Sequence, residues 1–267
     1  MTIKHPNERL THPYQSSYES TITKEVLEND MYLLHLSQRE IARKYNVGKG
    51  TIQNLQYRYG LEILNMYQRR VPQELTDEQK QLVYGTIIAD GHIFRKSDNR
   101  HGALKICHTT KKEPYVDYKY NLLKEFVRTK PTIQVSEVNG SVSVYKTFRT
   151  LTHIFFTDIH KMIYYKENEE YVKHLNVEIL EKQTPYSLAI AYMDDGTKHH
   201  YCRDFCFECF CFAEQQLFCD WLKDKFTIEA RVMKYRDGFR TRILRPSVSK
   251  FVSIIAPYLL DCFKYKL

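Results

Sequence analysis

The sequence predicts an α+β fold built from two similar halves and preceded by a small all-α unit. Helical periodicity with short breaks covers about residues 21–62. After residue 72, helix-type and strand-type patterns alternate, and the order helix, two strands, helix, two strands, helix occurs twice. A long period that occurs only twice indicates a duplicated unit, because a solenoid needs about three or more short repeats.

The charge balance favours a polyanionic partner. Among 267 residues, 40 Lys and Arg oppose 32 Asp and Glu, which gives a formal net charge of +8 that suits nucleic acid or an acidic membrane surface. With 43% hydrophobic and 27% charged residues, the composition excludes a largely disordered chain. No apolar run approaches the roughly 18 residues that span a bilayer, and Met1 to Ser20 lacks the apolar core of a signal peptide. We therefore expect a soluble, intracellular protein of the cytoplasm with no membrane partner.

Proline, polar residues and charge mark the boundaries between segments. The first 20 residues carry Pro6 and Pro13 without periodicity, which is typical of a loose arm. A polar, basic connector at residues 68–73 separates the helical region from the repeated region. The predicted segments are a flexible arm at residues 1–20, a helical module at 21–66, a linker at 67–81, a first half at 82–182 and a second half at 183–267.

Four of the seven cysteines crowd together at Cys202, Cys206, Cys209 and Cys211. The odd total and the lack of a secretion signal argue against a disulfide framework. A zinc site is one interpretation, but the spacing lacks a second pair of ligands of the usual kind. The favoured interpretation is that residues 205–212 form a buried strand, in which thiols act as small apolar side chains.

The helical module begins its central pair of helices with a complete start signal. Ser37 can cap the first helix while Glu40 reaches back, which is a capping box. Residues 46–48 break this helix, a second helix follows over about residues 49–59, and Gly60 closes it. This arrangement resembles a helix-turn-helix DNA-binding module.

Charge and side-chain types in the helical module suit DNA. Residues 38–70 hold seven Arg and Lys against two Glu, a local excess of +5 that suits phosphate contact. Lys49, Thr51, Gln53 and Asn54 lie near the start of the second helix, where side chains reach base edges in the major groove. The alternative is a plain helical hairpin with a solvated charged face. The capping box, the turn and the basic excess together favour DNA binding.

Two apolar stretches, Leu82–Gly91 and Leu188–Gly196, both end in Asp-Gly. Asp90 and Asp195 fall in the last turn of a predicted helix, each before a glycine suited to the position after a helix. A carboxylate is mildly unfavourable there, because that end carries partial negative charge. The repetition of this feature calls for a compensating cation. If the two helices pack side by side, the two carboxylates emerge together and form a site of the Mg²⁺ type.

These two stretches resemble the paired motifs of a LAGLIDADG homing endonuclease. Ser187–Gly196 resembles one version of the family's second motif, and Pro257–Leu267 resembles its C-terminal ending. The resemblance covers about residues 72–267. It implies a pseudo-two-fold α+β fold in one chain, with two αββαββα halves, the motif helices at the centre and two antiparallel sheets that form a basic saddle over DNA. It also implies a monomeric, site-specific double-strand DNA endonuclease that uses two or more Mg²⁺ ions and recognises a long target site.

The resemblance assigns roles to residues of the motif helices. Asp90 and Asp195 match the acidic position that binds metal and takes part in catalysis. Asp194 matches the position before it, which is a small helix-packing residue in many relatives. The family packs its motif helices through small residues, and the first motif offers Gly85 and Ala89 while the second offers Ser187 and Ala191. An asymmetric helix interface is therefore expected.

Further catalytic positions lie on strands. His108 matches the residue that positions water in the first half. Arg149 and Arg245, each on the last strand before a helix, are the candidates for the basic residue near each scissile phosphate, with Lys146 as an alternative. Strand registers slip easily, so these positions depend on the sheet geometry. The side chains expected to face the DNA groove are Arg95, Lys96, Asn99, Arg100, Lys105, Lys111, Gln134, Lys234, Arg236, Arg240 and Arg242.

Two other functions fit the same fold. One is a DNA-binding regulator without catalytic activity, and the other is a maturase that binds intron RNA. Retention of both Asp-Gly acids favours the endonuclease, because a protein that only binds has no need for two carboxylates beside phosphate.

Overall fold

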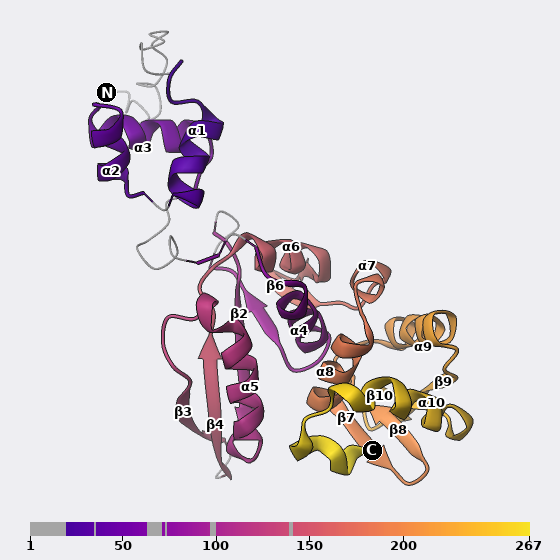
Figure 1. Ribbon diagram of the computed structural model, residues 1–267. Coiled ribbons are helices and arrows are strands. Elements are labelled where there is room, and N and C mark those ends of the chain that lie inside the picture. Colours follow the sequence, from indigo (N-terminus) through magenta and orange to yellow (C-terminus); the bar gives the residue numbers. More distant parts are fainter. Residues whose placement is uncertain (1–19, 35, 63–70, 73, 97–99, 139–140) are drawn as a thin grey trace, which may run out of the picture. The chain divides into compact units, whose positions relative to one another are not determined.

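The computed structural model describes residues 20–34, 36–62, 71–72, 74–96, 100–138 and 141–267, in two compact units (Figure 1). The first unit is Met1–Gln73 and the second is Glu74–Leu267. The predicted arm except its last residue, most of the connector and Asn99 lie outside the described residues.

The first unit is helical. It contains α1 (Lys24–Glu28), a π-helical turn (Asn29–Leu33), α2 (Gln38–Lys44) and α3 (Lys49–Arg58). The side chains that these helices bury against one another are Ile22, Leu27, Met31, Ile41, Ala42, Ile52 and Leu55.

The start of α2 and the end of α3 follow the sequence signals. The Ser37 hydroxyl accepts from the Glu40 backbone N–H at 3.2 Å, and the Glu40 carboxylate accepts from the Ser37 N–H at 2.6 Å, so the predicted capping box is confirmed. Asn46 turns the chain before α3 with a φ of 51°. Gly60 ends α3 with a φ of +66°, a left-handed conformation that glycine adopts without steric cost.

The second unit repeats one order of elements. Its first half contains α4 (Asp77–Ile87), β1 (His92–Phe94), β2 (Ala103–Thr109), α5 (Glu113–Leu123), β3 (Thr132–Val138), β4 (Ser141–Arg149) and α6 (Ile154–Ile163). Its second half contains α8 (Pro185–Asp195), β7 (Gly196–His199), β8 (Cys202–Phe205), α9 (Phe212–Phe226), β9 (Ala230–Tyr235), β10 (Gly238–Ile243) and α10 (Arg245–Ile255). The predicted α+β order is therefore confirmed in both halves.

The two sheets have the same antiparallel topology, β1-β2-β4-β3 and β7-β8-β10-β9. A hairpin, β5 (Tyr164–Glu167) and β6 (Glu170–Lys173), and the short α7 (Val177–Glu181) connect the halves. Helix α4 begins five residues earlier than the predicted first half, because Thr76 and Gln79 form a capping box there. Among the described helices, none combines the length and apolar character needed to cross a membrane.

Helices α4 and α8 pack directly against each other. Gly85 makes this possible, because a Cβ added there would lie 2.2 Å from the Ser187 carbonyl oxygen and 2.8 Å from the Ile190 Cβ. Ala191 is also fully buried on α8. The expectation of an asymmetric interface of small residues is confirmed, since Gly85 faces the backbone of Ser187 and not a second glycine.

The cysteine-rich segment is not a strand along its whole length. Strand β8 ends at Phe205, and the chain then turns until α9 begins. Cys209 and Cys211 are exposed, while Phe207 and Phe210 fold back into the core. The prediction of a buried strand over residues 205–212 is therefore wrong, because the aromatic side chains bury themselves from a turn.

Candidate active site

The two motif glycines are required by close backbone approach. Gly91 N–H donates to the Thr86 carbonyl at 2.7 Å, and a Cβ on Gly91 would lie 2.7 Å from that same oxygen. A Cβ on Gly196 would lie 2.1 Å from Cδ2 of Tyr192. Gly196 is extended, with φ −82° and ψ 149°, and the φ of Gly91 is not positive either. The expectation of helix-capping glycines is therefore replaced by a steric requirement.

Asp90 and Asp195, just before these glycines, influence each other's ionisation. Burial, the charges of Asp90 and Asp194, and a hydrogen bond with Asp90 raise the pKa of Asp195. Burial also opposes ionisation of Asp90, but the hydrogen bond and charge of His108 outweigh it and lower the pKa of Asp90. Ionisation is therefore easier for Asp90 than for Asp195. The charge of Lys173 opposes the rise in the pKa of Asp195, but burial and the two neighbouring carboxylates outweigh it.

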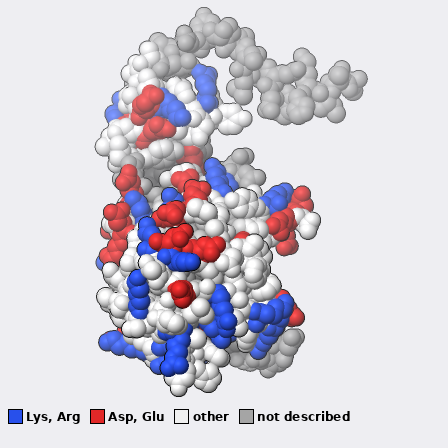
Figure 2. All heavy atoms as spheres, turned by 90° about the vertical axis from the view of Figure 1, so that its right-hand side faces the viewer, with Lys and Arg blue, Asp and Glu red and all other residues white. Residues whose placement is uncertain are grey.

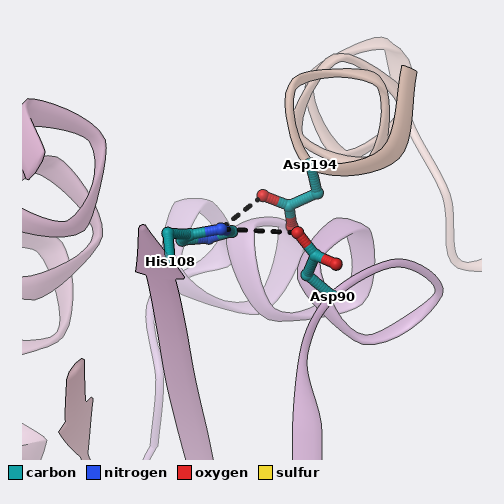
Figure 3. Close-up of side chains that lie close together, drawn as sticks. All are labelled: Asp90, His108 and Asp194. Carbon is teal, nitrogen blue, oxygen red and sulfur yellow. Dashed lines mark ion pairs between the residues drawn. The ribbon is translucent and has the colours of Figure 1, made fainter. Parts of the chain in front are cut away.

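His108 connects the two halves at the end of the motif helices. Figure 3 shows its ring pointing from β2 toward Asp90, just after α4, and toward Asp194 on α8. Its Nδ1 lies 3.3 Å from an Asp90 oxygen, and its Nε2 lies 3.4 Å from an Asp194 oxygen. The ring also packs against Tyr115 of α5, with 5.2 Å between ring centroids. His108 is 4% exposed, so it faces the interior of the site and not the outer surface of the sheet.

Within the described part of the chain, Asp90, His108 and Asp194 form the one group of three side chains that could hold a metal ion. Their ligand atoms all lie within 4.8 Å of one another. Asp194, however, already has a cationic partner, because Lys119 Nζ lies 2.8 Å from each of its carboxylate oxygens. Both side chains are fully buried. A metal ion at Asp194 would therefore have to compete with a lysine that is already in place.

Three lysines, Lys112, Lys173 and Lys266, donate to backbone carbonyls at the ends of α4 and α8. The acceptors, at 2.7 to 3.2 Å, are Ile87 and Ala89 for Lys173, Tyr192 and Met193 for Lys266, and Asp194 for Lys112. These cations lie at the negative end of each helix and supply the compensating positive charge expected there. Burial lowers the pKa of Lys266 to about 8.

Lys173 and Lys266 were missed by the sequence analysis. Each lies after the last helix of its half, Lys173 beyond α6 and Lys266 beyond α10. A comparison of the sequences that follow the last helix of each half could have identified these two lysines.

This combination of fold and site occurs in a known family. Residues 80–251 match the sequence profile of the LAGLIDADG DNA endonuclease family. The chain belongs to this family. The predicted activity, hydrolysis of DNA at specific sites by an endonuclease, is thereby confirmed.

The relatives include an endonuclease and a longer protein with a different name. DNA endonuclease I-ChuI of Chlamydomonas applanata is 29% identical over 209 residues, which are 72% of this chain and 95% of that protein. Protein RecA of Mycobacterium gastri is 26% identical over 213 residues, which are 73% of this chain but only 48% of that protein. The solved structure of the homing endonuclease I-WcaI bound to its DNA recognition sequence has a TM-score of 0.66 and 22% identity, and it covers 72% of this chain and 87% of that chain. The likeness to I-WcaI shows a shared fold.

Of the predicted basic residues of this LAGLIDADG endonuclease, Arg149 and Lys146 lie on the predicted strand and Arg245 does not. Arg149 ends β4 and is exposed. Arg245 is the first residue of α10 and not a strand residue, because Pro246 favours the start of a helix. Its predicted place on the last strand is wrong. Lys146 Nζ lies 2.6 Å and 2.8 Å from two carboxylates of α5, so it is held on the helix side of the sheet.

The residues expected to face the groove fall into three groups. Figure 2 shows that both signs of charge occur on one face of the molecule. The strand geometry, and not the net charge, therefore indicates which of these side chains could face a groove. Lys234 pairs opposite Phe239 on the side of α9 and lies 4.9 Å from that ring, which argues against a groove contact. Those on the side away from the helices are Lys105, Gln134, Arg240 and Arg242. Those in turns and connections are Arg95, Lys96, Arg100, Lys111 and Arg236.

Helix α3 of the first unit presents a polar face. Lys49, Gln53 and Asn54 are exposed, while Thr51 is half-buried. Tyr57 is 80% exposed on the same helix, and the sequence analysis did not single it out. Tyr57 is therefore a further exposed side chain of this helix.

Proposed function

We propose that this LAGLIDADG endonuclease cuts both strands of a long double-stranded DNA site at the paired carboxyl groups of Asp90 and Asp195. The observation that carries the proposal is that the two carboxyl groups come from the ends of two packed helices, one in each half. Burial and the charges of Asp90 and Asp194, which raise the pKa of Asp195, support it. Such a pair suits a reaction that occurs once on each strand.

The carboxyl pair fits a divalent cation such as Mg²⁺. Carboxylate oxygens are hard ligands, and Mg²⁺ is commonly held by one or two carboxylates together with phosphate oxygens of the substrate. A divalent cation at Asp90 and Asp195 would remove the repulsion that raises the pKa of Asp195. Asp194 is the poorer ligand, because Lys119 already neutralises it. When bound, such ions lower the pKa of water and balance charge that develops on the phosphate.

Side chains around the pair supply orientation and positive charge. His108 is placed to orient a water molecule near Asp90, since its ring is fixed between two carboxylates and against Tyr115. Lys173 and Lys266 are better placed than Arg149 and Arg245 as the basic residues of the two halves. Their positive charges already act on the carboxyl groups of this site, and a scissile phosphate bound there would experience the same charges.

The first unit is a second DNA contact in this proposal. The capping box, the turn at Asn46 and the exposed polar face of α3 support a helix-turn-helix module that reads bases beyond the main site. We keep its predicted start at residue 21 and the predicted boundary between the two halves at residues 182 and 183. The predicted linker at 67–81 is shortened, because α4 of the first half already begins at Asp77.

The test of the central proposal is a cleavage selection from a library of randomised duplex DNA in the presence of Mg²⁺. We expect recovery of one long, non-palindromic site cut on both strands, and no recovery with EDTA. The double variant Asp90→Asn with Asp195→Asn is the inactive control. Recovery of bound but uncut DNA would instead support the regulator, and preferential binding of intron RNA would support the maturase.

The contribution of the first unit is tested in the full-length chain. We expect Lys49→Ala with Asn54→Ala to weaken binding only to targets that contain the outer flank of the site, because contacts to base edges act locally. Lys24→Ala on α1, which removes an exposed lysine paired with Glu28, is the matched control. A DNase footprint of unchanged length on one long target would reassign α3 to a different partner.

A further inference from the structure

Each four-stranded sheet has an open face, which we define as the face turned away from the helices of its own half. Side chains alternate between the faces along a strand, and directly paired residues share a face. In the second half, Phe205 packs against Phe251 of α10, and the Thr241 hydroxyl contacts a side chain of α9. Their neighbours Asp204 and Arg242 therefore lie on the open face.

The open faces of the two halves differ in the outer strand pairs. On β3 and β4, the paired residues are Thr132 with Thr147, Gln134 with Tyr145, and Ser136 with Ser143. On β9 and β10, they are Arg231 with Arg242, Met233 with Arg240, and Tyr235 with Gly238. The first half thus presents neutral polar groups where the second half presents guanidinium groups.

One strand position close in sequence to the motif aspartates shows the contrast most clearly. In the first sheet, the residue two places after Asp90 pairs with Lys105. In the second sheet, the residue two places after Asp195 pairs with Asp204. Lys105 and Asp204 therefore occupy equivalent positions. Their partners on the next strand are Arg149 and Arg242. In the first half, two exposed cations therefore lie opposite each other, which is unfavourable without an anion beside them. In the second half, Arg242 Nε and Nη2 donate to the two Asp204 oxygens at 2.7 and 2.6 Å.

We propose that Arg242, held by Asp204, reads a guanine in the DNA half-site bound by the second half, whereas Lys105 and Arg149 contact phosphate in the other half-site. The inference rests on the proposed function, since it assumes that the open faces bind the target DNA. It makes the two half-sites chemically unequal.

The hydrogen-bonding capacity of Arg242 carries this assignment. Asp204 occupies the Nε side of the guanidinium and leaves two N–H groups at its outer edge. An arginine with two free N–H groups in one plane matches the O6 and N7 acceptors of guanine in the major groove. Asp204 is 3% exposed, so it fixes the orientation of the guanidinium before DNA binds. Lys105 and Arg149 have no acidic partner across the strand pair, and two adjacent cations suit the shared negative charge of phosphate oxygens.

The test is a binding selection from randomised duplex DNA with the full-length chain, scored separately from cleavage. We expect wild-type protein to select guanine at one or two positions of one half-site. Arg242→Lys keeps the charge but loses the planar fork, so guanine discrimination there should fall about tenfold or more with an unchanged salt dependence. Asp204→Asn should weaken the same preference, and thermal melting of both variants checks that they fold.

Arg149→Lys is the matched control, and it should leave every base preference unchanged within about twofold, because a phosphate contact does not read bases. Lys105→Gln with Arg149→Gln should weaken binding to all sequences and reduce the log–log salt slope by about 1.8. An unchanged guanine preference in folded Arg242→Lys and Asp204→Asn proteins would overturn the inference, and so would an equal loss of preference in Arg149→Lys. Neither result depends on cleavage, so both remain distinct from failure of the endonuclease proposal.

Discussion

Lys119 and Asp194 form a buried ion pair across the two halves, with Lys119 Nζ 2.8 Å from both carboxylate oxygens. Lys119 comes from α5 and Asp194 from α8, and neither side chain is exposed. Burial lowers the pKa of Lys119, and the charge of Asp194 opposes that effect. The pair therefore stabilises one particular arrangement of the halves and holds the carboxylate that faces His108.

Loss of one partner of this pair should be far more harmful than loss of both. We expect Lys119→Met to lower the free energy of unfolding of the second unit by about 3–5 kcal/mol, because it leaves a buried carboxylate without a cation. Adding Asp194→Ala, the residue type found at the equivalent Ala89, should recover most of that loss. Urea denaturation monitored by circular dichroism measures both. Lys264→Met, which removes an exposed pair with Asp261, should change stability by less than about 1 kcal/mol.

Replacement of either motif aspartate should separate binding from cleavage. We expect Asp90→Asn or Asp195→Asn to reduce double-strand cleavage by about 10²-fold or more, with DNA binding unchanged or tighter because repulsion from phosphate is relieved. Cleavage and gel-shift assays on one selected target measure the two effects. Asp158→Asn, at an exposed position on α6, is the charge-matched control and should cut normally. Full cleavage by the Asp90→Asn protein would refute its role at the metal.

The raised pKa of Asp195 predicts a pH dependence of stability in metal-free protein. The folded state keeps a proton on Asp195 at pH values where the unfolded chain has lost it, so folding favours the protonated form. This contribution is complete below about pH 4 and is lost as the pH rises through the raised pKa. We expect Asp195→Asn to remove that decline when unfolding is measured in EDTA from pH 5 to 8. An identical decline in wild type and variant would contradict the assignment.

Gly85 should not tolerate a side chain. We expect Gly85→Ala to destabilise the second unit by about 1–3 kcal/mol or more, because the added Cβ would lie 2.2 Å from a backbone oxygen of α8. Gly50 on α3 has no atom within 4 Å of an added Cβ, and Gly50→Ala should stabilise its helix by up to about 1 kcal/mol. Thermal melting of both variants gives the comparison.

The cysteine-rich turn should carry no stoichiometric zinc. Cys209 and Cys211 are exposed thiols, and the described residues place neither in a group of three metal ligands. We expect elemental analysis to find far less than one zinc per chain, and a thiol reagent to label these two faster than the buried Cys219. One zinc per chain together with unfolding on chelation would restore the zinc interpretation.

The order of elements could be predicted because each helix and strand carries its own periodicity. The capping boxes and the paired Asp-Gly ends are also local signals, as Ser37 with Glu40 shows. The turn after Phe205 could not be predicted in this way. Phe207 and Phe210 are buried like strand residues, and an apolar run does not show whether its side chains enter the core from a strand or from a turn.

The charged parts of the site depend on contacts between segments far apart in the sequence. Lys173 acts on carbonyls more than 80 residues away in the chain, at Ile87 and Ala89. Asp194 matched a helix-packing position in the sequence, whereas its partner in the structure is Lys119 on a different half. Periodicity gives no information on such pairs, because it reports only which face of an element is buried.

The asymmetry between α4 and α8 has a consequence for dividing the chain into its two halves. A half that forms a homodimer must be able to pair with its own copy. Two copies of the second half would bring two Asp194 carboxylates together without the lysine that neutralises them, Lys119. The two helices would also lack the space that Gly85 leaves for the backbone of α8. If the two halves were produced as separate chains, each should therefore associate with the other half and not with its own copy.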